Sequence, residues 1–275
     1  MWWPLLELGG RPPRVASDAF RFQAVPADIE ALNQRAIAGS DDLEITAASV
    51  ATYPRIASRY ALTACGSSVG DGYGPKLVAR QACQPTALRG CRIAIPGTGT
   101  TAFLTTSLLL GPDSFTPVVV PFKQIPERVA AGECDAGVVI HEGQLTYQDQ
   151  GLALVADLGA WWRQQSGLPL PLGANCVLRV LDQRHGPGTC QRVARLLEQS
   201  VQYALDHRQE SISYAMQFAE GLSVELADQF IGMYVNRWTL DYGPEGRRAV
   251  RTLLARAADA GLLPRVDEPE FIAGA

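Results

Sequence analysis

The pattern of hydrophobic and polar positions along this chain predicts short β-strands that alternate with helices. The clearest run contains three apolar strands, with a helix after each of the first two. Its five elements are expected at Cys91–Ile95, Thr101–Leu110, Pro117–Phe122, Pro126–Ala131 and Val138–Ile140. Strands and helices in this order, joined by short turns, are typical of a parallel sheet.

The N-terminal third of the chain gives weaker signals. Phe20–Val25 alternates like a strand, and Ala27–Ala38 has the spacing of an amphipathic helix that stops at Gly39. The glycines of a loop at Gly66–Pro75 indicate unusual dihedrals or a close backbone approach. Three further short strands are expected at Leu43–Thr46, Tyr60–Thr63 and Lys76–Arg80.

After the central run, the pattern predicts two strands and then only helices. The strands are expected at Leu152–Leu158 and Ala174–Val180, separated by Gly167–Gly173, whose prolines fix an extended backbone. We favour a rigid connector between two lobes for this segment over a wall of a ligand site. Amphipathic helices are expected over residues 193–205, 226–234 and 244–257.

Composition narrows the class of protein. Of the 275 residues, 47% are hydrophobic and 19% are charged, which favours a packed core, and the net charge of -4 without a basic stripe argues against nucleic-acid binding. No apolar run is long enough to span a membrane. Met1–Leu8 lacks the features of a secretory signal, so we expect a cytoplasmic protein. The six cysteines lack the spacing of a zinc site and are expected to be free thiols.

The first candidate for chemistry is His141, which directly follows the apolar strand Val138–Ile140. In open α/β sheets ligands bind at the carboxyl ends of strands. An imidazole at such a position can exchange a proton near neutral pH. The alternative is a histidine that is bonded only to its neighbours.

The second candidate is the turn before the predicted helix Thr101–Leu110. Gly97, Gly99 and Ala102 satisfy the dinucleotide fingerprint, but the next strand is followed by Lys123 rather than by the acid that holds a ribose. We therefore favour a helix N-terminus that faces a carboxylate or phosphate. Ser49 either caps the next helix or meets a ligand, and the cap is the favoured role.

Several of these segments, in this order, resemble the 1,4-dihydroxy-6-naphthoate synthase family of the futalosine route to menaquinone. The resemblance covers about residues 28 to 262, and its strongest part runs from His141 to Gly173. The matching pieces are Ile29–Asn33, Thr46 with Ser49, Gly70–Pro75, Pro96–Ala102, Ile140–Glu142, Leu145–Tyr147, Asp157–Trp162, Gly167–Gly173 and Tyr234–Asn236.

The resemblance implies an α/β fold of the type II periplasmic-binding-protein kind, with two lobes, mainly parallel sheets and a ligand cleft between the lobes. We expect lobe 1 at residues 1–76 plus 177–275, and lobe 2 at residues 77–176, carrying His141. The implied substrate is cyclic dehypoxanthinylfutalosine, a small molecule that a lyase would convert to 1,4-dihydroxy-6-naphthoate. A three-carbon sugar fragment would be lost. The resemblance implies no redox cofactor and no metal.

The resemblance also assigns roles to residues. It makes His141 the general base. It places Thr101 and Ala102 at the substrate, with Thr100 as a weaker candidate, and it does the same for Ala47, Ala48 and Ser49. No nucleic-acid or membrane partner is implied, and a homodimer is left open.

Two departures from the family pattern stand out. The chain lacks the usual first strand and its Ser-x-Cys-Pro-Asn-Asp loop, so that Met1–Gly10 corresponds to the remains of the first helix. Ala47 stands where the family commonly has lysine, and the loss of that cation is expected to weaken binding of a substrate carboxylate. Two other functions stay open: a solute-binding module without chemistry, and a nicotinamide-dependent oxidoreductase that uses the Gly97 turn.

Overall fold

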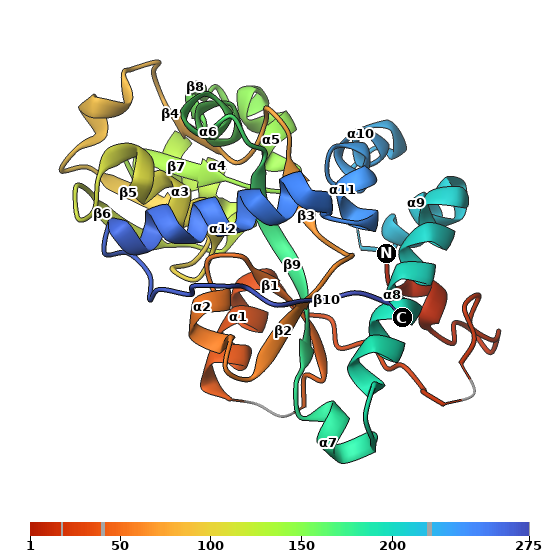
Figure 1. Cartoon of the computed structure of the whole chain (residues 1–275). Helices are drawn as coiled ribbons and strands as arrows, with labels where there is room; N and C mark the ends of the chain where they lie inside the picture. Colours follow the sequence, from red (N-terminus) through yellow and green to blue (C-terminus); the bar gives the residue numbers. More distant parts are fainter. Residues whose placement is uncertain (18, 40–41, 219–221, 275) are drawn as a thin grey trace.

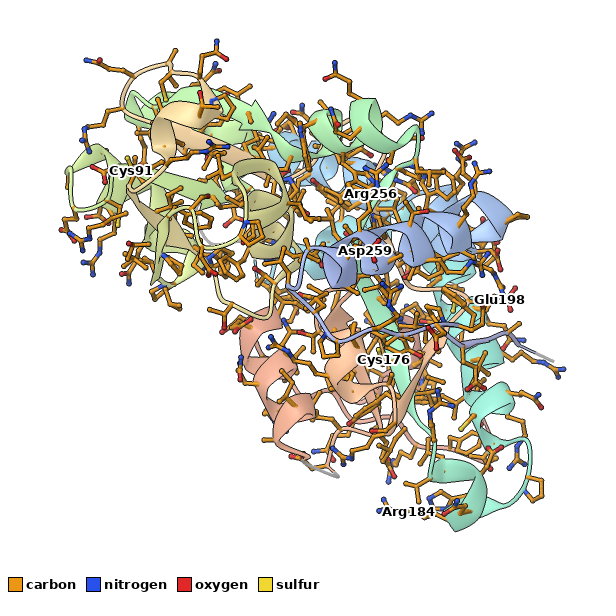
Figure 2. The ribbon with its side chains drawn as sticks, turned by 60° about the vertical axis from the view of Figure 1, so that its left-hand side comes forward. Cys91, Cys176, Arg184, Glu198, Arg256 and Asp259 are labelled. Atoms are coloured by element: carbon orange, nitrogen blue, oxygen red, sulfur yellow. The ribbon has the colours of Figure 1, made fainter. Side chains whose placement is uncertain are left out.

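The computed structural model describes residues 1–17, 19–39, 42–218 and 222–274. Its strands form two five-stranded sheets flanked by helices, and the long helix α12 (Gly243–Asp259) lies between the two sheets (Figure 1). Figure 2 shows the same two bodies from another side, with Cys91 in the body of the second sheet and Cys176 in that of the first. All six cysteines are free thiols, as the sequence predicts.

The first sheet is organised around one central strand, β9 (Leu170–Leu178), which is antiparallel to three partners. In this register Ala47 lies opposite Asn175, and Leu62 lies opposite Cys176. The other four strands are β1 (Ile45–Ser49), β2 (Tyr60–Thr63), β3 (Ser68–Gly70) and β10 (Phe271–Ile272), the last of which runs parallel to β2.

The second sheet has the strand order β6-β5-β7-β4-β8. Its strands are β4 (Lys76–Ala79), β5 (Arg92–Ile95), β6 (Thr116–Val119), β7 (Ala136–Val139) and β8 (Ala153–Asp157). β5 is parallel to β6 and β7, which confirms the parallel arrangement predicted for the central run. β4 is antiparallel to both of its neighbours, β7 and β8.

Helices follow the strands closely, and both chain ends lie beside α8 (Figure 1). Besides α12, the α-helices are α1 (Ile29–Ala38), α2 (Tyr53–Ile56), α3 (Thr101–Leu110), α4 (Ile125–Ala130), α5 (Gly143–Thr146), α6 (Leu158–Ser166), α7 (Leu181–His185), α8 (Thr189–Asp206), α9 (Arg208–Ala215), α10 (Val224–Tyr234) and α11 (Arg237–Leu240). Short 3-10 helices are η1 (Trp3–Leu5), η2 (Pro85–Leu88), η3 (Phe122–Gln124) and η4 (Tyr147–Gln150). Among the described residues, none of these helices is both long and apolar enough to cross a membrane.

Two connections between the sheets cross at very close range. A Cβ atom at Gly159 would lie 1.9 Å from the Tyr73 carbonyl oxygen, and one at Gly74 would lie 2.8 Å from the Gly159 nitrogen. Glycine is therefore required at both positions, because the backbone that leads into β4 touches the backbone of the first turn of α6. The Gly66–Pro75 loop is thus a close backbone approach, as its composition predicts.

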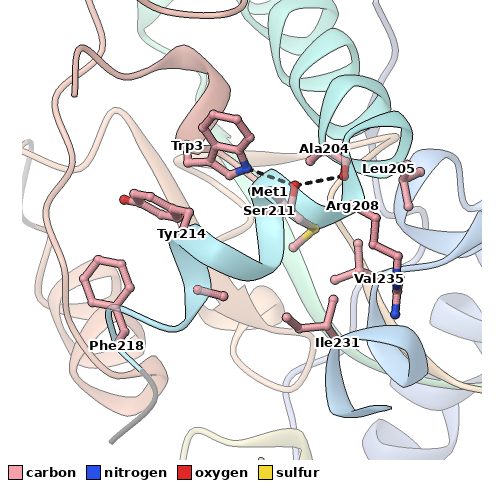
Figure 3. A pocket seen from close by; sticks show the side chains of 11 residues that line it. Met1, Trp3, Ala204, Leu205, Arg208, Ser211, Tyr214, Phe218, Ile231 and Val235 are labelled. Atoms are coloured by element: carbon pink, nitrogen blue, oxygen red, sulfur yellow. Dashed lines mark hydrogen bonds between the residues drawn. The ribbon is translucent and has the colours of Figure 1, made fainter. Parts of the chain in front are cut away.

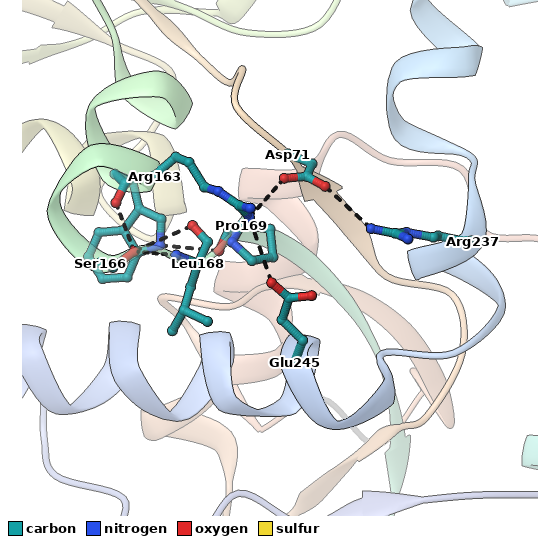
Figure 4. Close-up of polar contacts among 8 residues, drawn as sticks. Asp71, Arg163, Ser166, Leu168, Pro169, Arg237 and Glu245 are labelled. Atoms are coloured by element: carbon teal, nitrogen blue, oxygen red, sulfur yellow. Dashed lines mark hydrogen bonds and ion pairs between the residues drawn. The ribbon is translucent and has the colours of Figure 1, made fainter.

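An ion-pair network lies next to this crossing (Figure 4). Asp71 accepts from Arg163 of α6 at 3.0 Å and pairs with Arg237 of α11 at 3.6 Å, while Arg163 also pairs with Glu245 of α12 at 3.7 Å. These side chains are partly exposed, and such pairs contribute little each to the free energy of folding. Their joint effect is to connect the crossing loop with three helices.

Several sequence expectations are wrong in detail. Phe20–Val25 forms no strand, and the sheets are mixed rather than mainly parallel. Residues 170–176 were assigned from the sequence to lobe 2, but they pair with β1 and β3 in the first sheet. They belong to β9, which begins at Leu170 rather than at the predicted Ala174. The alternating pattern of Phe20–Val25 has no neighbouring strand to supply backbone hydrogen bonds, and a lone strand is not stable.

Candidate active site

His141 has an unusual backbone conformation at the carboxyl end of the buried strand β7. Its φ angle is +52°, and among the described residues only Asp113 shares a positive φ without being glycine. The left-handed region costs an L-residue about 1 kcal/mol or more, and such strain concentrates at functional sites.

Aromatic rings surround the imidazole of His141. The ring centroids of Phe122, from η3, and Phe230, from α10, lie 4.6 and 6.1 Å from the imidazole. Tyr234 continues this cluster 5.2 Å from Phe230, and its hydroxyl donates to Gln144 Oε1 at 2.6 Å. Helix α10 therefore adds an aromatic contact to His141 through Phe230.

This environment sets the protonation state of the histidine. Burial lowers the pKa of His141 below 6.5, and the carboxylates of Glu142 and Asp28 oppose this shift to a smaller extent. Burial acts in this direction because it disfavours the charged imidazolium. The imidazole is consequently neutral at pH 7 and is able to accept a proton.

The turn before α3 is held by its own threonines. Thr100 caps α3 by accepting from the Phe103 N–H at 3.2 Å, and its hydroxyl donates to the Gly97 carbonyl at 2.7 Å. The Thr101 hydroxyl accepts from the Ala51 N–H and donates to the Leu172 carbonyl at 2.7 Å. Both hydroxyls are buried and already hydrogen-bonded, so a ligand would meet the helix N–H groups of this turn rather than these hydroxyls.

The segment Ala47–Ser49 forms the end of β1. Ala48 is buried in the core of the first sheet and Ala47 is half-buried opposite Asn175. Ser49 is not a helix cap, contrary to the favoured sequence interpretation, because α2 begins later, after Thr52. Instead Ser49 exchanges two hydrogen bonds with the Asn33 side chain, at 2.8 and 3.0 Å.

The first turn of α1 brings these groups together. Asp28, the N-cap of α1, acts electrostatically on His141, and Glu30 accepts from the Gly99 N–H at 3.2 Å. Asn33, on the next turn, holds Ser49. The α3 turn and the end of β1 therefore both contact the N-terminal half of α1, and Asp28 at its start acts on the charge of His141.

The residues that make these links were not predicted from the sequence. Glu30 and Asn33 lie within the family-like segment Ile29–Asn33, and their spacing of three positions puts them on one helix face. This spacing indicates a shared helix face, but no neighbouring residue in the sequence indicates that the face contacts Gly99. Another missed pair is Lys76 with Asp157, 3.1 Å apart and largely buried across β4 and β8.

A separate cavity of about 290 Å³ lies between the N-terminal segment and α8, α9 and α10 (Figure 3). Its walls are mostly apolar, and the charged Arg208 in its wall is bonded to Asp228 at 2.8 Å. The cavity contains none of the site residues predicted from the sequence. The helix α10 borders both places, because Ile231 and Val235 face the cavity whereas Phe230 lies near His141.

Comparison with known proteins identifies the family. The sequence profile described as menaquinone biosynthesis matches residues 1–259. A protein of Thermus thermophilus named 1,4-dihydroxy-6-naphthoate synthase is 41% identical over 251 residues, which cover 91% of this chain and 89% of that relative. The chain belongs to the menaquinone biosynthesis family. The predicted resemblance is confirmed, and so is the expectation of an enzyme of the naphthoate synthase type.

Solved structures place this family member among two-lobed binding-protein folds. A crystal structure of a protein from Archaeoglobus fulgidus has a TM-score of 0.78 and 39% identity, and the match covers 88% of each chain. The alkanesulfonate-binding protein SsuA from Xanthomonas axonopodis has a TM-score of 0.60 and 17% identity, covering 86% of this chain and 81% of that one. The latter similarity shows the fold alone, and it confirms the predicted fold class. Below, the parts built around the first and second sheets are called lobe 1 and lobe 2.

Proposed function

We propose that this protein is a lyase that converts cyclic dehypoxanthinylfutalosine to 1,4-dihydroxy-6-naphthoate, with His141 as the general base. The observation that carries the proposal is His141 itself: a strained, half-buried residue at a strand end whose pKa is lowered because its charged form is partly shielded from water. Its aromatic surroundings suit a substrate that becomes a bicyclic aromatic product.

In the proposed reaction the neutral imidazole takes a proton from the substrate and starts ring opening. Elimination then releases a three-carbon sugar fragment, and formation of the aromatic ring supplies the driving force. The imidazolium returns its proton as the products form, so that His141 ends the cycle neutral. Burial favours this return because it disfavours the charged imidazolium.

The remaining site residues are proposed to bind rather than to react. Thr101 and Ala102 would present the first N–H groups of α3 to a substrate oxygen, and Thr100, the weaker candidate, would contribute as the N-cap of that helix. Ala47, Ala48 and Ser49 would line the opposite wall through their backbone and the Ser49 hydroxyl. Ala47 stands where the family commonly has lysine, so we expect weaker binding of a substrate carboxylate.

The test is incubation of the purified chain with cyclic dehypoxanthinylfutalosine, followed by mass detection of the naphthoate. The matched variant is His141→Asn, because asparagine tolerates a positive φ but is not a base. We expect product from the native protein and a loss of 10²- to 10⁴-fold in kcat for the variant, the usual contribution of a general base. Equal turnover by both proteins would remove His141 from the mechanism.

A solute-binding module without chemistry is the second candidate, and the similarity to SsuA in fold favours it. It predicts that the compound raises the melting temperature of the native protein although no naphthoate is formed.

A cytoplasmic location is also part of our proposal, and cell fractionation with an antibody against the chain tests it. The homodimer left open by the sequence is tested by light scattering.

A further inference from the structure

The carboxylate of Glu30 bridges the two lobes at the α3 turn. Glu30 belongs to α1, which packs on β1 in lobe 1, whereas its two carboxylate oxygens both accept from the Gly99 N–H of lobe 2 at 3.2 Å. Within α1 the same carboxylate accepts from Gln34 Nε2 at 2.8 Å and from Asn33 Nδ2 at 3.3 Å. Three donors therefore fix the carboxylate in one place.

The glycines of the α3 turn make room for this carboxylate. A Cβ atom at Gly97 would lie 2.3 Å from the Glu30 carboxyl carbon, and one at Gly99 would lie 2.9 Å from Glu30 Oε2. Gly97 also has a φ of +155°. The glycine pair that resembles a dinucleotide fingerprint thus has another explanation, since its cradle is filled by a side chain of the protein itself.

A second set of contacts continues this link into lobe 1. Asn33, whose side chain touches Glu30, exchanges two hydrogen bonds with Ser49 at the end of β1. The Thr52 hydroxyl donates to the Gly99 carbonyl at 2.9 Å, so that both the N–H and the C=O of Gly99 are held from lobe 1. The α3 turn and the end of β1, which are both proposed to bind substrate, are thereby connected through the partly buried Glu30 and the buried Asn33.

We propose that Glu30 is a substrate-positioning residue, which holds the Gly97–Ala102 turn of lobe 2 against lobe 1. It acts through the Gly99 peptide and does not react itself. Its role rests on the proposed function, because the segments that it aligns are the proposed substrate walls. Without the carboxylate, the α3 turn loses its hydrogen-bond acceptor and the closed arrangement of the two walls becomes a smaller fraction of the population.

The experiment compares Glu30→Ala and Glu30→Gln with the native protein and with the control Glu127→Ala, an exposed acid of α4. Glutamine keeps an oxygen that accepts from Gly99, whereas alanine does not. We expect Glu30→Ala to raise KM about ten-fold with kcat within about two-fold, because fewer molecules have aligned walls before substrate arrives. Glu30→Gln is expected to recover most of this loss, and Glu127→Ala is expected to match the native enzyme.

Hydrogen exchange of the Gly99 amide is the readout that does not depend on activity. We expect at least ten-fold faster exchange in Glu30→Ala than in the native protein, with Glu30→Gln in between. Unchanged Gly99 exchange, or faster exchange with an unchanged KM, would overturn the proposal. If the native protein forms no naphthoate while Gly99 exchange responds as expected, the proposed function fails and the link between the lobes stands.

Discussion

His141 combines backbone strain, burial and a neutral side chain in one residue. Its left-handed φ occurs in the short turn between the buried β7 strand and α5, which begins two residues later at Gly143. Phe122 and Phe230 approach the ring from lobe 2 and from α10, respectively. The properties expected of a general base therefore come from long-range packing around a residue that local sequence only marks as a candidate.

The pH dependence of the reaction should report this environment. Since burial lowers the pKa of His141 below 6.5 and the neutral form is the base, kcat/KM is expected to rise with pH to a midpoint below 6.5 and then to stay level. Asp28→Asn removes a charge that raises this pKa, while asparagine keeps the cap on Ala31. The midpoint is therefore expected to move to lower pH.

The control for this profile is Asp267→Asn, which removes an exposed carboxylate from the C-terminal segment. The measurement is kcat/KM between pH 4.5 and 8.5 for the three proteins, at conditions where each stays folded. A midpoint that moves upward in Asp28→Asn, or one that moves equally in Asp267→Asn, would contradict the assigned electrostatic role of Asp28.

Among the elements, the entry to α6 has the least room for change. A Cβ atom at Gly159 would meet the backbone of Tyr73 at 1.9 Å, so one of the two connections between the lobes must move in Gly159→Ala. Overpacking of this kind costs about 1–3 kcal/mol, and we expect a loss of about 2 kcal/mol in the free energy of unfolding by urea.

Gly143→Ala in α5 is the matched control, because its Cβ atom would lie 3.5 Å from that of Val139, in ordinary contact. Alanine is also the better helix former, so this variant is expected to stay within about 1 kcal/mol of the native protein. Equal stability of the two variants would show that the crossing tolerates a side chain.

Elements with complete local signals were predictable from sequence. α3 was predicted with both ends correct, because Thr100 is a capping residue and Gly111 follows the last apolar position. β9 was predicted too short, since its first residues are selected by partners a hundred or more positions earlier in the chain. The antiparallel direction of β4 was not predicted for the same kind of reason, because it is set by pairing with the distant strands β7 and β8. Glu30 was missed because its acceptor role depends on a turn 69 positions away.

At the scale of the whole molecule, the half-buried His141 also affects stability. The pKa of His141 is lowered in the folded state, so below pH 6.5 the unfolded chain binds more protons than the folded one. The free energy of unfolding should therefore fall as the pH drops below 6.5, and this part of the slope should be absent in His141→Asn. Urea titrations of both proteins at pH 5 and pH 7.5 measure the difference, and parallel losses would exclude His141 as the cause.

The position of β9 has a consequence for how the chain is made. Lobe 2 is built from one continuous stretch, residues 76–157, and contains every strand of its sheet. Lobe 1 lacks its central strand until residue 178 has left the ribosome. Because domains fold as units during synthesis, the second half of the site is expected to form first, and β1 and β2 wait unpaired on the nascent chain until β9 emerges. The order in which the lobes fold is thus the reverse of the order in which they begin.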